Sequence, residues 1–108
     1  MATRSRIAIE NQDRTISSIY CHWDGYPEGV GATLKDHYSD SKKLQQLIDL
    51  GDISSLDNTT STTVAYHRDR GESLNKARVN RSLDAFRNSD YEQYGYVFTL
   101  DNQWNIFS

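Results

Sequence analysis

Cysteine and proline are scarce in this sequence of 108 residues, which contains one of each. The single cysteine, Cys21, excludes an intrachain disulfide bond and a zinc site built from several thiolates. It also indicates a reducing environment, which favours the cytoplasm. No apolar run is long enough for a secretion signal or a membrane-spanning helix, so we expect no membrane association. The length predicts a single domain that covers residues 1–108.

A large excess of charge of one sign is lacking as well. The net charge of −3 is too small to indicate, by itself, a protein that binds nucleic acid. Basic residues gather between Arg68 and Arg87, but acidic residues interrupt them and exposed aromatic side chains for base stacking are lacking. A nucleic-acid partner is therefore not expected.

The usual signatures of catalysis and metal binding are missing too. The three histidines, His22, His37 and His67, are far apart and show no metal-ligand spacing, so we expect no metal and no cofactor. There is no G-x-S-x-G elbow and no phosphate-binding glycine loop followed by Lys and Ser or Thr. Cys21 lies on the inward side of a predicted strand, which predicts an unreactive thiol. The sequence provides no candidate catalytic residue, and it favours a non-enzymatic protein.

Alternation of apolar and polar residues near the start of the chain, and aromatic and β-branched residues around a polar turn near its end, predict two β-hairpins. The first joins residues 6–10 to residues 15–23 through a polar turn, and the second joins residues 94–100 to residues 104–107. An isolated hairpin is unstable in water. We therefore expect the two hairpins to form one antiparallel sheet of four to five strands.

Three stripes of apolar residues at helical spacing lie between the hairpins. They predict a short helix around residue 34, a second helix that residues 39–41 cap and Gly51 ends, and a third over residues 76–88. Residues 52–63 are polar and predict a loop, and residues 63–66 predict a short strand. The fold class is α+β, with two to three helices packed on one face of the sheet. The stripes are Val30, Leu34 and Tyr38, then Leu44, Leu47 and Ile48, then Val79, Leu83 and Phe86.

The stretch YCHWDGYPEGVG, residues 20–31, concentrates aromatic rings, glycines and polar groups. His22 and Asp24 are two residues apart, so on an extended chain they share a face, where a carboxylate can orient an imidazole. The alternative interpretation is a junction between a strand and a helix, roofed by aromatics and shaped by glycine and proline. We favour the junction, with its polar members and Tyr26 at the border of a binding surface.

A second candidate is the stretch AYHRDRGE, residues 65–72. Alternating charges on a loop usually form a solvated surface, but two arginines can also grip a phosphate or a carboxylate in a bidentate manner. Together the two stretches supply the candidate binding residues, which are His22, Asp24, Tyr26, His67, Arg68, Asp69, Arg70 and Glu72.

These two stretches also carry a resemblance. With Ile7, Ile9 and Glu10 before it and Leu34, His37 and Tyr38 after it, YCHWDGYPEGVG resembles a family of small uncharacterised proteins encoded by tailed bacteriophages and prophages. AYHRDRGE and the tyrosine-rich C-terminal hairpin are similar to the rest of that pattern. The resemblance implies a setting, which is the cytoplasm of a bacterial host cell, and it implies no mechanism.

Two functions follow as hypotheses. The first is a non-enzymatic protein that binds a host or phage macromolecule, for example to inhibit a bacterial enzyme or a defence system. The alternative is a small-ligand or nucleotide-binding protein with weak hydrolytic activity, whose site lies between residues 20–31 and 65–72. It predicts that His22, Asp24, His67 and Arg68 converge on one concave pocket. A third reading, a virion or assembly component, predicts self-association.

Overall fold

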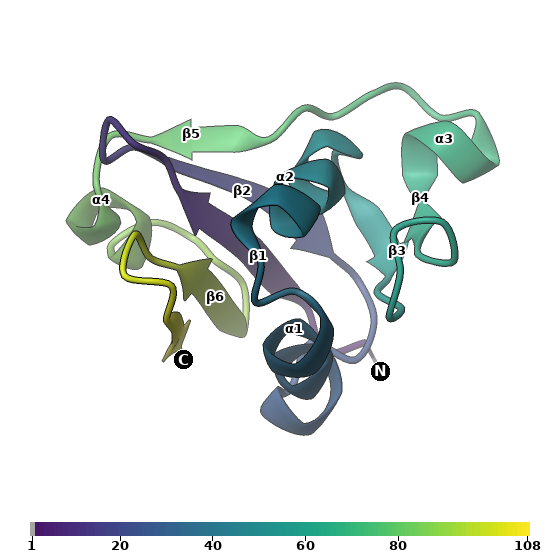
Figure 1. Ribbon diagram of the computed structural model, residues 1–108. Coiled ribbons are helices and arrows are strands. Elements are labelled where there is room, and N and C mark those ends of the chain that lie inside the picture. The colour runs from purple at the N-terminus through teal and green to yellow at the C-terminus, as the bar shows by residue number, and fades with distance from the viewer. Residues whose placement is uncertain (1) are drawn as a thin grey trace.

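The computed structural model describes residues 2–108 and contains the two predicted hairpins (Figure 1). The first pairs β1 (Ser5–Glu10) with β2 (Ile16–Cys21) in antiparallel register, and the second pairs β6 (Tyr94–Phe98) with β7 (Trp104–Phe107). Both hairpins belong to one sheet, as the sequence predicts. The α+β class is confirmed.

The sheet is mixed, so the prediction of an entirely antiparallel sheet is wrong. The hairpins meet through β1 and β6, which run parallel with Ile7 opposite Tyr96. A second parallel pair joins β2 to β3 (Ile53–Ser55). Alternation of apolar residues shows which face a side chain occupies and carries no information on strand direction. The direction depends on the end of the sheet to which the middle of the chain returns.

The described residues form a sheet of seven strands, in place of the predicted four to five. The predicted strand within residues 63–66 is present as β4 (Val64–Ala65). The two additional strands are β3, in the segment predicted as a loop, and β5 (Arg78–Asn80), which pairs with β2. Each has three residues, which is too short for alternation to show.

The helix predicted over residues 76–88 is wrong in its first half. β5 occupies that part of the chain, and Val79 is 62% exposed, so it does not belong to a buried stripe. The helix α4 (Leu83–Arg87) begins after Ser82, whose hydroxyl accepts a hydrogen bond from the Ala85 N–H at 3.1 Å. This N-cap fixes where the helix starts.

The other two helical predictions are confirmed. A π-helical turn, η1 (Pro27–Gly31), leads into α1 (Ala32–His37), and α2 (Ser41–Asp49) follows. The Asp40 side chain caps α2 by accepting a hydrogen bond from the Lys42 N–H. A further helix, α3 (Tyr66–Arg70), brings the number of α-helices in residues 2–108 to four, in place of two to three.

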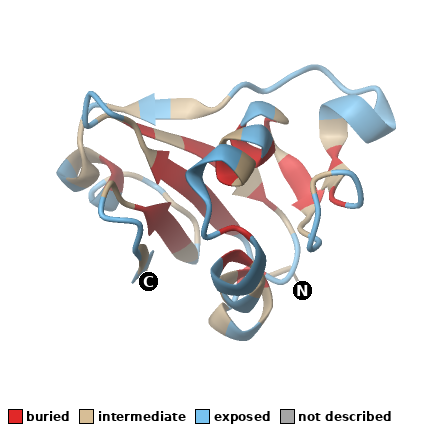
Figure 2. Ribbon diagram, in the orientation of Figure 1, coloured by how far each residue is buried: buried red, intermediate tan, exposed pale blue. Residues whose placement is uncertain are grey.

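The larger hydrophobic core lies between one face of the sheet and the helices α1 and α2; α2 lies in front of the strands and α1 lies below them in the view of Figures 1 and 2. The three residues of each confirmed stripe are buried there, together with alternate residues of the central strands. The core residues are Ile7, Ile9, Ile19, Cys21, Val30, Leu34, Tyr38, Leu44, Leu47, Ile48, Ile53, Ala65, Tyr96 and Phe98.

A smaller cluster lies on the opposite face of the sheet. Ala8 and Val97 point there because they alternate with the residues of the larger core, and Phe86 of α4 packs on them. The helices therefore lie on both faces, and the prediction that they pack on one face is wrong. No helix in residues 2–108 is long and apolar enough to cross a membrane, and α2 has only nine residues.

We predict that Gly51 is less tolerant of substitution than Gly71, although both have positive φ, 77° and 68°. A methyl group at Gly71 meets no atom within 4 Å, so Gly71→Ala costs only the left-handed strain, about 1 kcal/mol. At Gly51 the Cβ would lie 2.5 Å from the carbonyl oxygen of Asn75. Gly51→Ala therefore adds overpacking of about 1–3 kcal/mol. Urea unfolding measures both values, and equal losses would contradict this packing.

Candidate functional site

The junction between β2 and η1 is held by hydrogen bonds from distant parts of the chain. The Gly25 N–H donates to the Thr3 carbonyl at 2.8 Å, and the buried Tyr96 hydroxyl donates to the Gly25 carbonyl at 2.6 Å. The Val30 N–H donates to the Asp24 carbonyl, also at 2.8 Å. Asp24 itself has a φ of 60°, in the left-handed region. Residues 22–26, which we call the aromatic loop, therefore have one fixed backbone conformation.

Two glycines of this junction are required by close approach of the backbone. A Cβ at Gly25 would lie 2.7 Å from the Thr3 carbonyl oxygen, and one at Gly29 would lie 2.4 Å from that of Asp24. These contacts support the interpretation of residues 20–31 as a shaped junction. However, not all of its aromatic side chains cover the core. Trp23 is 45% exposed and Tyr26 is 38% exposed.

His22 has a tyrosine partner and no bond to the predicted carboxylate. Its Nδ1 lies 2.6 Å from the Tyr20 hydroxyl, and its ring meets the Trp23 ring edge to face, with centroids 4.8 Å apart. The Asp24 carboxylate is 3.5 Å from the Tyr26 hydroxyl. The left-handed turn at Asp24 ends the extended conformation on which the predicted pairing with His22 depended.

Arg68 and Asp69 of α3 bond to the backbone near β4. Arg68 donates to the carbonyls of Thr60 and Thr63 at 2.9 and 2.6 Å, and Asp69 accepts from the Ala65 N–H at 2.8 Å. The two side chains also form an ion pair of 2.9 Å. The hydrogen bond from Arg68, followed by that from Ala65, lowers the pKa of the Asp69 carboxyl. Contacts of this kind cover the backbone groups at the edge of a sheet and stabilise the structure there.

The other residues of this segment also have local partners. The His67 Nδ1 lies 2.8 Å from the Glu72 carbonyl oxygen. Arg70 lies over the ring of Tyr66, with its guanidinium carbon 5.3 Å from the ring centre, and it reaches the Ser54 hydroxyl at 3.4 Å. His67, Arg68, Asp69, Arg70 and Glu72 are all exposed.

His22 and Arg70, one residue from each candidate segment, approach the same face of the sheet at β3. Cys21 and Ile53 are paired and both point into the larger core, so His22 and Ser54 point to the other face. Arg70 approaches that face through Ser54, and the Trp23 N–H donates to the Ser54 carbonyl. Ser54 therefore contacts both segments. The other polar side chains of the two segments form hydrogen bonds with groups close to them in the sequence or in the neighbouring strand.

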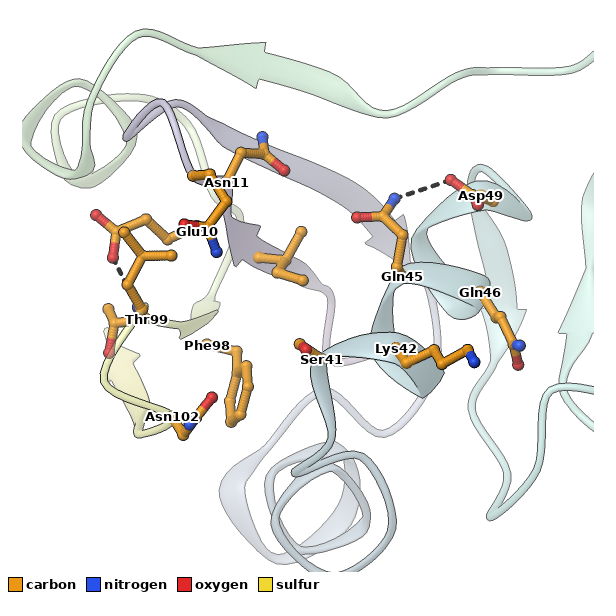
Figure 3. A pocket seen from close by; sticks show the side chains of 13 residues that line it. Glu10, Asn11, Ser41, Lys42, Gln45, Gln46, Asp49, Phe98, Thr99 and Asn102 are labelled. Carbon is orange, nitrogen blue, oxygen red and sulfur yellow. Dashed lines mark hydrogen bonds between the residues drawn. The ribbon is translucent and has the colours of Figure 1, made fainter.

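A cavity of about 550 Å³ lies elsewhere, between α2 and the ends of β1 and β6 (Figure 3). Five amide side chains line it, and Phe98 faces it from the sheet, across from Ser41 of α2. Two carboxylates there are already bonded: Glu10 accepts from the Leu100 N–H at 2.9 Å, and Asp49 accepts from Gln45 at the same distance. The amides are Asn11, Gln12, Gln45, Gln46 and Asn102.

Sequence reasoning missed this cavity because its walls come from three separated segments of the chain. The adjacent Gln45 and Gln46 on the polar side of α2 are the one local signal for it. None of the eight candidate binding residues from the sequence lines it.

The Cys21 thiol lies in the larger core and is poorly suited to act as a nucleophile. Burial raises the pKa of the Cys21 thiol to about 12, so the thiol stays protonated near neutral pH. Burial also raises the pKa of the Tyr96 hydroxyl. Within residues 2–108, no group of three or more His, Cys, Asp or Glu side chains is placed to hold a metal ion.

Comparison of the chain with models of known protein families, with curated proteins and with solved structures gives no match. The resemblance to phage-encoded proteins therefore stays a prediction from the residues.

We predict that Arg68→Met moves the pKa of Asp69 back toward its ordinary value, because the variant removes the group that lowers it most. Because the pKa of Asp69 is depressed in the folded state, its contribution to stability is present above the unfolded-state pKa and is lost as the pH falls through the folded-state pKa. The advantage of the wild type over the variant should therefore shrink on acidification.

Carboxyl carbon NMR measures this titration. Asp13 is the internal control, because its pKa is lowered by hydrogen bonds from Thr15 and should not respond to Arg68→Met. An unchanged pKa of Asp69 in the variant would show that the ion pair does not persist in solution.

Proposed function

We propose that the protein is a non-enzymatic binding protein that engages another protein through the aromatic loop. One observation carries the proposal: Trp23 and Tyr26 are 45% and 38% exposed on a backbone that buried contacts fix. Tryptophan and tyrosine are enriched among the residues that dominate binding energy at protein interfaces. A rigid loop that presents them loses little conformational entropy on binding.

The backbone of the loop gives further support. A residue other than glycine at positive φ, such as Asp24, costs free energy and persists only where the surrounding structure imposes it. The Asp24 and Glu28 residues are also exposed, and each lies within two residues of Tyr26 in the sequence. They favour a partner with an apolar pocket bordered by basic groups, and they disfavour nucleic acid because phosphates would be repelled.

The resemblance noted in the sequence extends the proposal to a setting. The partner is a host or phage protein in the cytoplasm of a bacterial cell, for example an enzyme or a component of a defence system that the protein inhibits. The proposal names no catalytic residue. The protonated, buried Cys21 thiol and the local bonds of His22 and His67 support a non-enzymatic role.

Affinity capture from a bacterial lysate tests the proposal when two variants are compared. The double variant Trp23→Ala/Tyr26→Ala should lose the partner that the wild type retains. With the purified partner, calorimetry should show an affinity about 1,000-fold weaker, because the two truncated anchors cost about 2 kcal/mol each.

The matched control is Leu74→Ala/Val79→Ala, which also removes two exposed apolar side chains, 41% and 62% exposed, away from the loop. It should bind the partner as the wild type does. If the loop variant retains the same proteins as the control, the aromatic loop is not the binding surface.

The cavity beside α2 favours a second candidate function, the binding of a small, uncharged, polar ligand. Amide groups both donate and accept hydrogen bonds, so the five lining amides suit hydroxyl or amide groups of a ligand. The charged lining residues are the Glu10 and Asp49 carboxylates and the Lys42 ammonium, so the net charge is negative and disfavours a nucleotide phosphate at this place. This candidate moves the small-ligand site away from residues 20–31 and 65–72, where the sequence suggested it.

NMR screening with a library of small polyols, sugars and amides tests this second candidate. A ligand should shift the side-chain amide signals of Asn11, Gln45 and Asn102. Gln45 points toward Asn11 across the cavity (Figure 3), so Gln45→Trp should fill the cavity and abolish the shifts of the two asparagines. Asn88→Trp, on the exposed surface at the end of α4, is the control and should leave them intact. Shifts that survive Gln45→Trp would place the ligand elsewhere.

A further inference from the structure

The sheet has edge strands whose backbone groups are protected to different degrees. A free edge offers unpaired N–H and C=O groups to another strand, and proteins usually block it with charge, proline, irregularity or a covering segment. At β4 the protection is direct, because Asp69 bonds to the Ala65 N–H and Arg68 bonds to the Thr63 carbonyl. α3 thus covers that edge.

β5 is protected by its composition and length. It has three residues, with Arg78 at one end and Arg81 directly after the other. Charged side chains of this kind oppose pairing with another copy, because the same charges would be brought together. Val79 is exposed at its centre, but a single apolar residue between two arginines makes a poor edge for pairing.

β7 has none of these protections. Its four residues, WNIF, include no charge, no proline and no glycine, and the nearest charged residue before it is Asp101. Ile106 is 52% exposed. β7 pairs only with β6, so it is the edge strand at the end of the sheet opposite β4.

The outward backbone groups of β7 can be assigned from the turn. The Thr99 N–H donates to the Gln103 carbonyl at 3.0 Å, so these two residues form a hydrogen-bonded pair. Pairs of the two kinds alternate along an antiparallel ladder. Asn105 and Phe107 therefore bond to β6, whereas Trp104 and Ile106 direct their N–H and C=O groups away from the sheet.

We propose that β7 pairs antiparallel with β7 of a second copy of this chain across a two-fold axis at Asn105. In this register Trp104 lies opposite Ile106 of the second copy, and the reverse pair is equivalent. All four outward groups of each β7 are then bonded, and each Ile106 side chain packs on a Trp104 ring. The sheets of the two copies become one continuous sheet.

Symmetry and charge both favour a second copy of this chain as the binding partner of β7. The outward groups lie one residue on either side of Asn105, so a two-fold axis satisfies them all with identical chains. No charged residue enters the paired segment, so association does not bring like charges of this acidic chain into contact. The strand contact is smaller than a standard interface of about 1,200–2,000 Å². We therefore expect a weak dimer whose population rises between micromolar and millimolar concentrations.

Sedimentation across this range tests the proposal with two matched variants. Ile106→Lys should weaken dimerisation at least about tenfold, because a lysine on the edge blocks strand addition. Val79→Lys makes the same type of change on β5 and should sediment as the wild type does. Both side chains are exposed, so both variants should keep the native near-UV circular dichroism. A wild type that stays monomeric at millimolar concentration, or that forms open-ended assemblies, would overturn the proposal.

The register has a separate test by cross-linking. Asn105 should face its own copy in a pair without hydrogen bonds, where Cα atoms lie about 4.5 Å apart, within the range that a disulfide spans. Asn105→Cys should therefore form an oxidised dimer, whereas Gln103→Cys, two residues away from the axis, should stay monomeric. Equal cross-linking of both variants, or of neither, would refute this register. Cys21 is buried and does not compete.

Discussion

The parallel pairing of β1 with β6 is the constraint on which the rest of the structure depends. It joins the two hairpins, and it brings Tyr96 beside Ile7 with its ring in the larger core. From there the Tyr96 hydroxyl reaches the Gly25 carbonyl and fixes the aromatic loop. The same pairing leaves β7 at the end of the sheet. The position of the loop and the exposure of the edge thus have a common origin in one strand pair.

The elements that could be predicted are those whose signal lies within a few residues. The α2 helix carries its apolar stripe, its Asp40 cap and its Gly51 stop in the sequence itself. Strand direction and the three-residue strands β3 and β5 depend on partners far along the chain, which leave no local pattern. Val79 misled the helical prediction because its spacing fits a stripe while its side chain is exposed in β5.

Composition indicated residues 20–31 and 65–72 as candidate segments, whereas the bonding partners of their side chains depend on tertiary contacts. The glycines of residues 20–31 do act as shape residues, as close backbone contacts at Gly25 and Gly29 show. The charges of α3 were visible as an alternating pattern, yet only the folded chain reveals that Arg68 and Asp69 bond to the backbone beside β4. A pattern of charges in the sequence identifies exposed residues, whereas the groups to which those residues bond depend on the folded structure.

Asp24 differs from Arg14 and Asn102, two other non-glycine residues with positive φ, in the contacts that hold it. Arg14 and Asn102 lie in hairpin turns, where a backbone bond within the turn stabilises each conformation. Around Asp24, the neighbouring Gly25 is held by Thr3 and by Tyr96, which lie at opposite ends of the chain. Local turn chemistry alone therefore does not explain the conformation of the aromatic loop. Contacts with both hairpins offset the free-energy cost at Asp24, so the positions of the exposed Trp23 and Tyr26 depend on the same strand pairing that joins the sheet.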